Sequence, residues 1–299
     1  MKKNGIRMPV SDRIFNVIIH ILLILAVIVT FYPIFFVVIA SVSDPIYVNS
    51  GTFLLYPKGF TLLGYTRVFD DARIWSGYLN TIIYAVFGTL LGLFCSLLAG
   101  YALSRKDLPG RNIIMAIMVF TMYFSGGLIP FYMVVKNLGL TNTRILMVIL
   151  GSVSVYNIIL IRSFCSMTIP VELQEAAFID GCSNQRFFVS VVLPLSKAII
   201  AVIGLYLAVG YWNAFFNPMI FLTDRSKFPL QLYLREILLT AKTSDAGSNS
   251  DPEAAVRLEI MIGVIKYGVI VVSTIPIICV YPFIQKYFVK GVMIGSIKG

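Results

Sequence analysis

A polar segment, residues 170–194, lies between two long apolar stretches and carries the most informative spacing of polar side chains in this chain. It reads PVELQEAAFIDGCSNQRFFVSVVLP. Pro170 favours the start of a helix, where its fixed backbone angle is tolerated. Glu172 and Glu175 then lie near the positively polarised end of that helix, which their carboxylates stabilise. Because Gly181 permits the left-handed turn with which many helices end, the sequence predicts a short helix from Pro170 to Gly181.

The chemistry that this predicted helix offers is docking onto another protein. The Glu175 carboxylate can pair with a basic group on a partner, and the small Ala176 and Ala177 side chains allow close approach. Phe178 can act as an apolar anchor, and a second helix is predicted from about Asn184 to the next apolar stretch. The residues predicted to dock are Glu175, Ala176, Ala177, Phe178, Asp180 and Gly181.

Residues for covalent chemistry are scarce. No glycine is followed directly by lysine, so the Walker A loop that binds nucleotide phosphates is absent. The only histidine, His20, lies in an apolar stretch and is expected to have a structural role. The four cysteines match no zinc-binding spacing. We therefore predict no catalytic residue, no metal site and no cofactor bound by this chain.

The segments that must position the polar loop are membrane spans. The chain is 58% hydrophobic and only 13% charged, outside the range of ordinary globular proteins. A membrane-spanning helix needs about 20 apolar residues. The sequence therefore predicts an all-α, polytopic membrane protein: a single domain over residues 1–299 with a cytoplasmic loop at about 166–197 and six transmembrane helices at about 14–39, 78–103, 113–135, 145–165, 198–222 and 262–284.

Basic residues indicate the orientation of these spans. Residues 1–13, the loop 104–111 and the C-terminal end are rich in lysine and arginine, and the five basic residues of the outer segment 223–261 are offset there by six carboxylates. By the positive-inside rule, the first three segments and the loop 170–194 lie in the cytoplasm. We therefore predict a multi-pass protein of the cell membrane with both termini cytoplasmic, and we interpret the net charge of +10 as topology rather than nucleic-acid binding.

Two predicted spans contain small residues that are expected to affect how their helices pack or bend. The predicted span 78–103 has Gly88, Gly92, Ser96 and Gly100 on one helical face, which favours close helix packing, within this chain or against a partner. The span 113–135 contains Ser125-Gly126-Gly127 and Pro130, which are expected to break the helix. Such a break indicates either the wall of a transport pathway or a packing kink.

The complete pattern of the polar loop resembles the cytoplasmic coupling loop of permease subunits of ATP-binding-cassette (ABC) importers. Glu175-Ala176-Ala177, Gly181 and Leu193-Pro194 stand at the positions of the family pattern. The chain also resembles the carbohydrate-uptake branch of these permeases, whose model is the maltose transporter. The matching segments are Tyr101-Ala-Leu-Ser-Arg105 and Tyr287-Phe-Val-Lys-Gly291. Ser125–Pro130 and Gly210–Asn217 are similar to a subgroup that takes up complex oligosaccharides such as pectin- or uronate-derived fragments.

The resemblance implies a transport subunit with no ATPase site of its own, which imports oligosaccharides by alternating access. The implied partners are a second, homologous permease subunit in a heterodimer, two ATPase subunits that bind ATP and magnesium, an extracytoplasmic solute-binding protein and membrane lipid. The resemblance also implies that the outer segment 223–261, whose residues 229–240 show helical apolar spacing, contacts the solute-binding protein.

A substrate pathway is a further expectation. Aromatic rings can stack on sugar rings and amides can bond sugar hydroxyls, although aromatic residues also form interfacial belts and pack in cores. The candidate pathway residues are Tyr123, Tyr156, Asn157, Tyr211, Trp212, Asn213 and Asn217.

Other functions remain as alternatives. An ABC permease for another class of solute would share the coupling loop. A secondary carrier would be expected to have intramembrane carboxylates and inverted repeats, neither of which the sequence shows.

Overall fold

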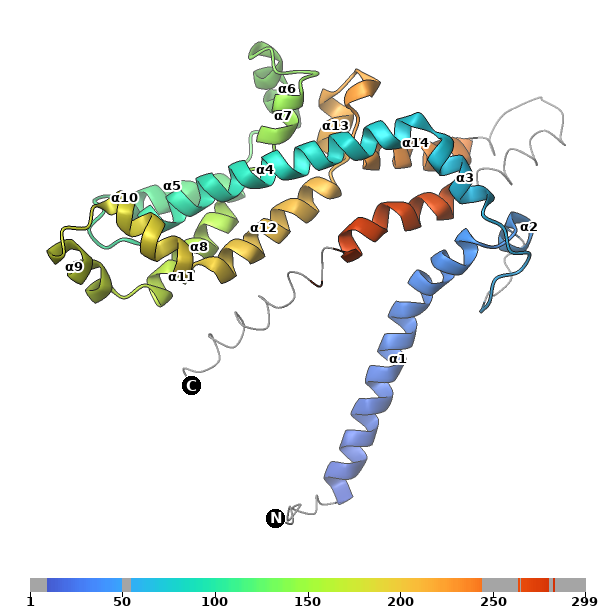
Figure 1. Cartoon of the computed structure of the whole chain (residues 1–299), viewed down its shortest axis with the longest axis horizontal. Helices are drawn as coiled ribbons and strands as arrows, with labels where there is room; N and C mark the ends of the chain where they lie inside the picture. The colour runs from blue at the N-terminus through green and yellow to red at the C-terminus, as the bar shows by residue number, and fades with distance from the viewer. Residues whose placement is uncertain (1–9, 50–54, 244–262, 264, 280–281, 283–299) are drawn as a thin grey trace. The chain divides into compact units, whose positions relative to one another are not determined.

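The structure is a computed structural model that describes residues 10–49, 55–243, 263, 265–279 and 282 (Figure 1). Every regular element within these residues is a helix. The chain divides into two compact units, one of Met1–Asp70 with Ile237–Val272, and one of Asp71–Glu236 with Ser273–Gly299. The all-α prediction is therefore confirmed for the described part of the chain.

The first unit contains α1 (Val10–Ser41), α2 (Pro45–Asn49) and α3 (Leu63–Asp70). Most of α1 is apolar on all sides and exposed, as expected for a helix surrounded by lipid. Near its C-terminal end, Ile39 and Ala40 pack with Val48, Phe36 and Tyr267. The α1 helix contains the predicted first span.

The second unit is organised around α4 (Ala72–Ser104), its longest helix (Figure 1). The Asp71 side chain caps its start by accepting a hydrogen bond from the backbone N–H of Arg73 at 2.9 Å. The helix packs mainly against α8 (Val155–Thr168) and α12 (Lys197–Trp212). Its small-residue face is buried in these contacts, so the expected close packing occurs within this chain.

The predicted break in the third span is confirmed. Helix α5 (Arg111–Tyr123) and helix α6 (Leu128–Asn137) meet at an angle of 110° across Ser125-Gly126-Gly127. Gly127 has a φ of +88°, which side chains disfavour, and this explains why the break falls at a glycine.

Two predicted spans are interrupted in the structure. The predicted span 145–165 consists of α7 (Arg144–Ile149) and α8, separated at Gly151, whose φ is +87°. The predicted span 198–222 consists of α12 and α13 (Phe216–Phe221). Because Pro218 has no N–H to donate and its ring would collide with the carbonyl of residue 214, α12 cannot continue through this region.

The polar loop forms α9 (Val171–Ile179), α10 (Asn184–Phe187), the π-helix η1 (Phe188–Val192) and α11 (Leu193–Leu195). A 78° bend separates the segment Asn184–Leu195 from α12. After α13 follow the short helix η2 (Arg225–Lys227) and α14 (Leu230–Thr243), which contains most of the expected helical stretch 229–240. The remainder of the outer segment, residues 244–261, lies outside the described residues.

The described helices account for only some of the six predicted membrane spans. Two of them, α1 and α4, are long and apolar enough to cross a membrane, and up to four spans result if each bent pair counts as one. Residues 265–279 form a further apolar helix, but much of the predicted sixth span lies outside the described residues. The count of six spans stays a prediction.

Candidate functional site

The α9 helix ends in a turn that requires glycine. Gly181 has a φ of +76°, and its N–H donates to the Phe178 carbonyl at 3.0 Å. The Cys182 N–H donates to the Ala177 carbonyl at 2.9 Å. These two bonds form a Schellman motif, in which a left-handed residue satisfies the last carbonyls of a helix. The structure thus explains the Ala-Ala…Gly spacing in local terms.

The surface of α9 is available for contact. No residue of α9 is buried, and Glu175, Ala176 and Asp180 are exposed. Ile179 is 87% exposed, although it is a large apolar residue. A large apolar side chain left this exposed, next to an exposed carboxylate, is consistent with a surface that another protein covers.

We define α9 and α10 together as the hairpin. Its other side is anchored in the second unit. Phe187 of α10 is fully buried in a cluster with Ile161 of α8 and Ile203 of α12. Phe178 meets Phe187 edge to face, with ring centroids 6.2 Å apart. Docking residues therefore stand on a hairpin that is fixed to two helices of the unit.

Arg105 follows α4 directly. In the sequence it stood out only as a basic residue that orients the membrane spans and as part of a family motif, and not as a site residue. Its guanidinium forms a bidentate ion pair with Asp107 and donates to Asn184 Oδ1 at 2.6 Å. The Arg105 guanidinium lowers the pKa of the Asp107 carboxyl below its ordinary value by hydrogen bonding, so the pair is ionised at neutral pH.

A pocket of about 680 Å³ lies beside this pair, between the start of α9, the end of α8 and the loop after α4. Glu175 lines it together with Arg105, Arg111 and Arg162. The carboxylate that is predicted to dock therefore stands at the edge of a basic recess.

The predicted pathway residues do not form one site. Asn157 and Tyr211 are buried, whereas Tyr123 is 81% exposed and Tyr156 is 52% exposed. The Tyr211 hydroxyl donates to the Val148 carbonyl at 2.6 Å, an arrangement that stabilises the interruption between α7 and α8. In this structure Tyr211 is a packing residue with its polar group satisfied.

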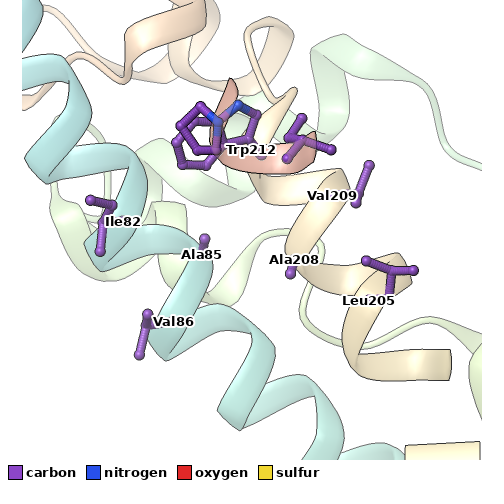
Figure 2. Close-up of a pocket in the computed structure, with 9 residues that line it drawn as sticks. Ile82, Ala85, Val86, Leu205, Ala208, Val209 and Trp212 are labelled. Atoms are coloured by element: carbon purple, nitrogen blue, oxygen red, sulfur yellow. The ribbon is translucent and has the colours of Figure 1, made fainter. Parts of the chain in front are cut away.

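Trp212 lies at one end of an apolar pocket of about 190 Å³ (Figure 2). Its indole Nε1–H donates to the Ser273 carbonyl at 3.0 Å. The side chains that line the pocket offer no other polar group, so the pocket itself suits hydrocarbon rather than sugar hydroxyls. The lining residues are Ile82, Ala85, Val86, Leu205, Ala208, Val209, Trp212, Pro276 and Ile277.

The two amides of the aromatic segment differ in their surroundings. The Asn213 side chain is exposed and donates to the Val209 carbonyl in the preceding turn at 3.0 Å. Asn217 lines a recess of about 20 Å³ with Tyr84 and Tyr211, which is too small for a sugar ring. The structure therefore brings Tyr211 and Asn217 together, and the other five predicted residues do not line this recess.

The chain is similar to known proteins over most of its length. Residues 88–294 match the family described as binding-protein-dependent transport system inner membrane component. The polygalacturonan/rhamnogalacturonan transport system permease protein YtcP of Bacillus subtilis (strain 168) is 38% identical over 97% of this chain and 100% of its own length. Protein LplC of the same organism is 38% identical over 91% of this chain and 90% of its own length.

A solved structure is also similar throughout. One chain of a bacterial ABC transporter involved in the import of the acidic polysaccharide alginate is 34% identical, with a TM-score of 0.84. The similarity covers 95% of this chain and 100% of that one. The family match alone spans well over half of the sequence. The chain therefore belongs to the inner membrane components of binding-protein-dependent transport systems, the permease subunits of ABC importers.

Proposed function

We propose that this chain is one of two homologous permease subunits in an importer of uronate-containing oligosaccharides, and that its α9–α10 hairpin receives the motion of an ATPase subunit. The observation that carries the coupling role is the exposed α9 surface on a hairpin anchored to α8 and α12. When the ATPase subunits close on ATP, the hairpin moves and the broken helices switch access between the two sides of the membrane.

The proposed assembly contains four further proteins: a homologous permease, two ATPase subunits and an extracytoplasmic solute-binding protein. We place both termini and the hairpin in the cytoplasm, in a six-span domain surrounded by lipid. The outer segment that includes α14 is proposed to contact the solute-binding protein. Family membership supports this assembly and argues against the alternative of a stand-alone secondary carrier.

ATP and magnesium are proposed to bind only to the partner ATPase subunits. The purified chain alone, in detergent or lipid, should neither bind ATP at micromolar concentration nor hydrolyse it, because the sequence has no phosphate-binding loop. Equilibrium binding of labelled ATP measures this, with the isolated ATPase subunit as the positive control. Saturable binding to the partner-free chain would contradict the assignment.

The names of relatives at different levels of identity support the proposed substrate class. Those with 38% and 34% identity include proteins named for polygalacturonan/rhamnogalacturonan and for alginate, which are acidic polysaccharides. Proteins named for diacetylchitobiose, arabinooligosaccharides and melibiose, which are neutral sugars, are 27%, 26% and 25% identical. An importer of another solute class remains the second possibility.

The complete complex should take up oligouronates in preference to neutral oligosaccharides of the same length. Reconstituted vesicles with internal ATP and external binding protein would be given oligogalacturonates, oligoalginates and maltooligosaccharides. We expect uptake to differ by at least about tenfold, a difference of about 1.4 kcal/mol. Equal or faster uptake of the neutral series would refute the uronate preference while leaving the permease role intact.

A further inference from the structure

We infer that Arg105 is the positioning residue that fastens the α9–α10 hairpin to the cytoplasmic end of α4. Through it, movement of the hairpin reaches the longest helix of the second unit. This inference rests on the proposed function of the hairpin, since it assigns a route for the motion that the hairpin receives.

The Arg105 guanidinium contacts both helices of the hairpin. Arg105 Nη1 donates to Asn184 Oδ1 at the start of α10, at 2.6 Å. The Arg105 Cζ atom lies 5.6 Å from the ring centroid of Phe178, which is on α9. A cation over an aromatic ring is attracted to it, so Arg105 holds one polar and one aromatic point of the hairpin.

The Arg105 guanidinium is itself held in place from the α4 side. Arg105 Nε donates to Asp107 Oδ1 at 2.8 Å, and Nη2 donates to Asp107 Oδ2. Nη1 also lies 3.4 Å from the Tyr101 hydroxyl, one turn back on α4. The Arg105 side chain is only 13% exposed, although it carries a charge. Its orientation is thus fixed by residues of α4 and of the loop that follows.

Two other arginines bind the same end of α4. Arg162 Nε of α8 donates to the Leu103 carbonyl at 3.2 Å. Arg111 Nη1 of α5 donates to the Arg105 carbonyl at 3.2 Å. Cations near the C-terminus of a helix also stabilise its negative pole. The end of α4 is therefore a junction where α5, α8 and the hairpin meet.

The apolar anchor of the hairpin does not replace this polar one. Phe187 fixes the base of α10 in the core, but Phe178 is 38% exposed and α9 has no buried residue. Contacts within the apolar cluster resist withdrawal of the hairpin, whereas directional hydrogen bonds at Arg105 fix its rotation. We expect the transmission of motion from the hairpin to α4 to depend on these hydrogen bonds, which fix the rotation of the hairpin.

The experiment compares Arg105→Lys and Asn184→Ala in the complete complex. Lysine keeps the positive charge but lacks the planar fork that reaches Asp107 and Asn184 together. Both variants should keep the ATPase subunits bound, because the outer surface of α9 is unchanged. Uptake per ATP hydrolysed should fall by about tenfold, within the range of a coupling free energy between sites.

A double variant and a neighbouring control sharpen the test. Because Arg105→Lys and Asn184→Ala remove the same bond, the double variant should be no worse than Arg105→Lys alone. Lys106→Gln removes an adjacent exposed cation that lines the same recess but makes none of these bonds, so it should leave uptake per ATP unchanged if the bonds rather than the charge of the recess matter. Additive losses, or a loss with Lys106→Gln as large as with Arg105→Lys, would overturn the inference.

A second measurement does not depend on transport. Hydrogen exchange in the nucleotide-free complex should be at least about tenfold faster at the amides of residues 171–187 in both single variants, as expected for a lower cost of local opening. Unchanged exchange there, unchanged uptake per ATP or loss of the ATPase subunits would each overturn the role of Arg105. If the unaltered complex imports no oligosaccharide, the proposed function fails, while the exchange result still decides whether Arg105 holds the hairpin.

Discussion

Glu175→Lys should abolish transport while the protein still inserts into the membrane and assembles with the second permease. The substitution replaces attraction by repulsion at a docking charge, and loss of such a pair costs about 2–5 kcal/mol. Glu175 is exposed and belongs to no buried cluster, so folding of this chain should not change. Co-purification of the ATPase subunits and uptake in vesicles measure the effect.

Glu175→Gln serves as the graded comparison. It removes the charge but keeps a hydrogen-bond acceptor of the same size, so transport should be weaker but present. Normal uptake and normal ATPase co-purification in Glu175→Lys would remove the α9 surface from the coupling role.

A companion substitution tests the turn that shapes this surface. Gly181→Asp places a Cβ on a residue with a φ of +76° and adds a second carboxylate beside Asp180, so transport should also be lost. Gly139→Asp is the matched control, because Gly139 has a φ of +66° and forms the same pair of bonds at the end of α6. The control carries the same backbone strain and should retain transport. Equal loss in both would indicate strain alone.

Gly92→Ala should destabilise the second unit, although it adds only one methyl group to a helix. A Cβ at residue 92 would lie 2.4 Å from the Ser152 carbonyl oxygen and 2.8 Å from a Leu207 methyl group. The carbonyl is backbone and cannot move aside, and overpacking of this kind costs about 1–3 kcal/mol. The melting temperature of the purified permease pair should fall by several degrees.

Gly210→Ala is the control for this effect. A Cβ at residue 210 meets no atom within 4 Å, and alanine is a better helix former than glycine. This variant should be as stable as the original protein or slightly more stable. A melting temperature for Gly92→Ala equal to that of Gly210→Ala would contradict the close contact between α4 and the loop before α8.

Local signals in the sequence were sufficient for the hairpin and for one helix break. The ends of α9 follow from Pro170 and Gly181, and the break between α5 and α6 follows from Gly126 and Gly127. These features depend on backbone angles that neighbouring residues dictate, so they can be predicted without tertiary contacts.

The interruptions at residues 150–154 and 213–215 were not predicted, because each is short and is flanked by long apolar stretches that keep the average hydropathy high. Pro218 was an available signal for the second interruption. The first depends on Gly151 together with the bond from Tyr211 to Val148, which joins residues far apart in the sequence. The same limit applies to Arg105, whose partner Asn184 lies on another helix.

The most direct test of the account is a photoreactive cross-linker at residue 176 or residue 179 of α9 in the complete complex. Residue 179 is 87% exposed, so a cross-linker there reaches whatever covers α9. The account predicts a covalent adduct with the ATPase subunit, identified by mass spectrometry, and none from a cross-linker at residue 129, which is 77% exposed on α6. No adduct from either α9 position, or an ATPase adduct from residue 129 instead, would contradict the assignment of α9 as the coupling surface.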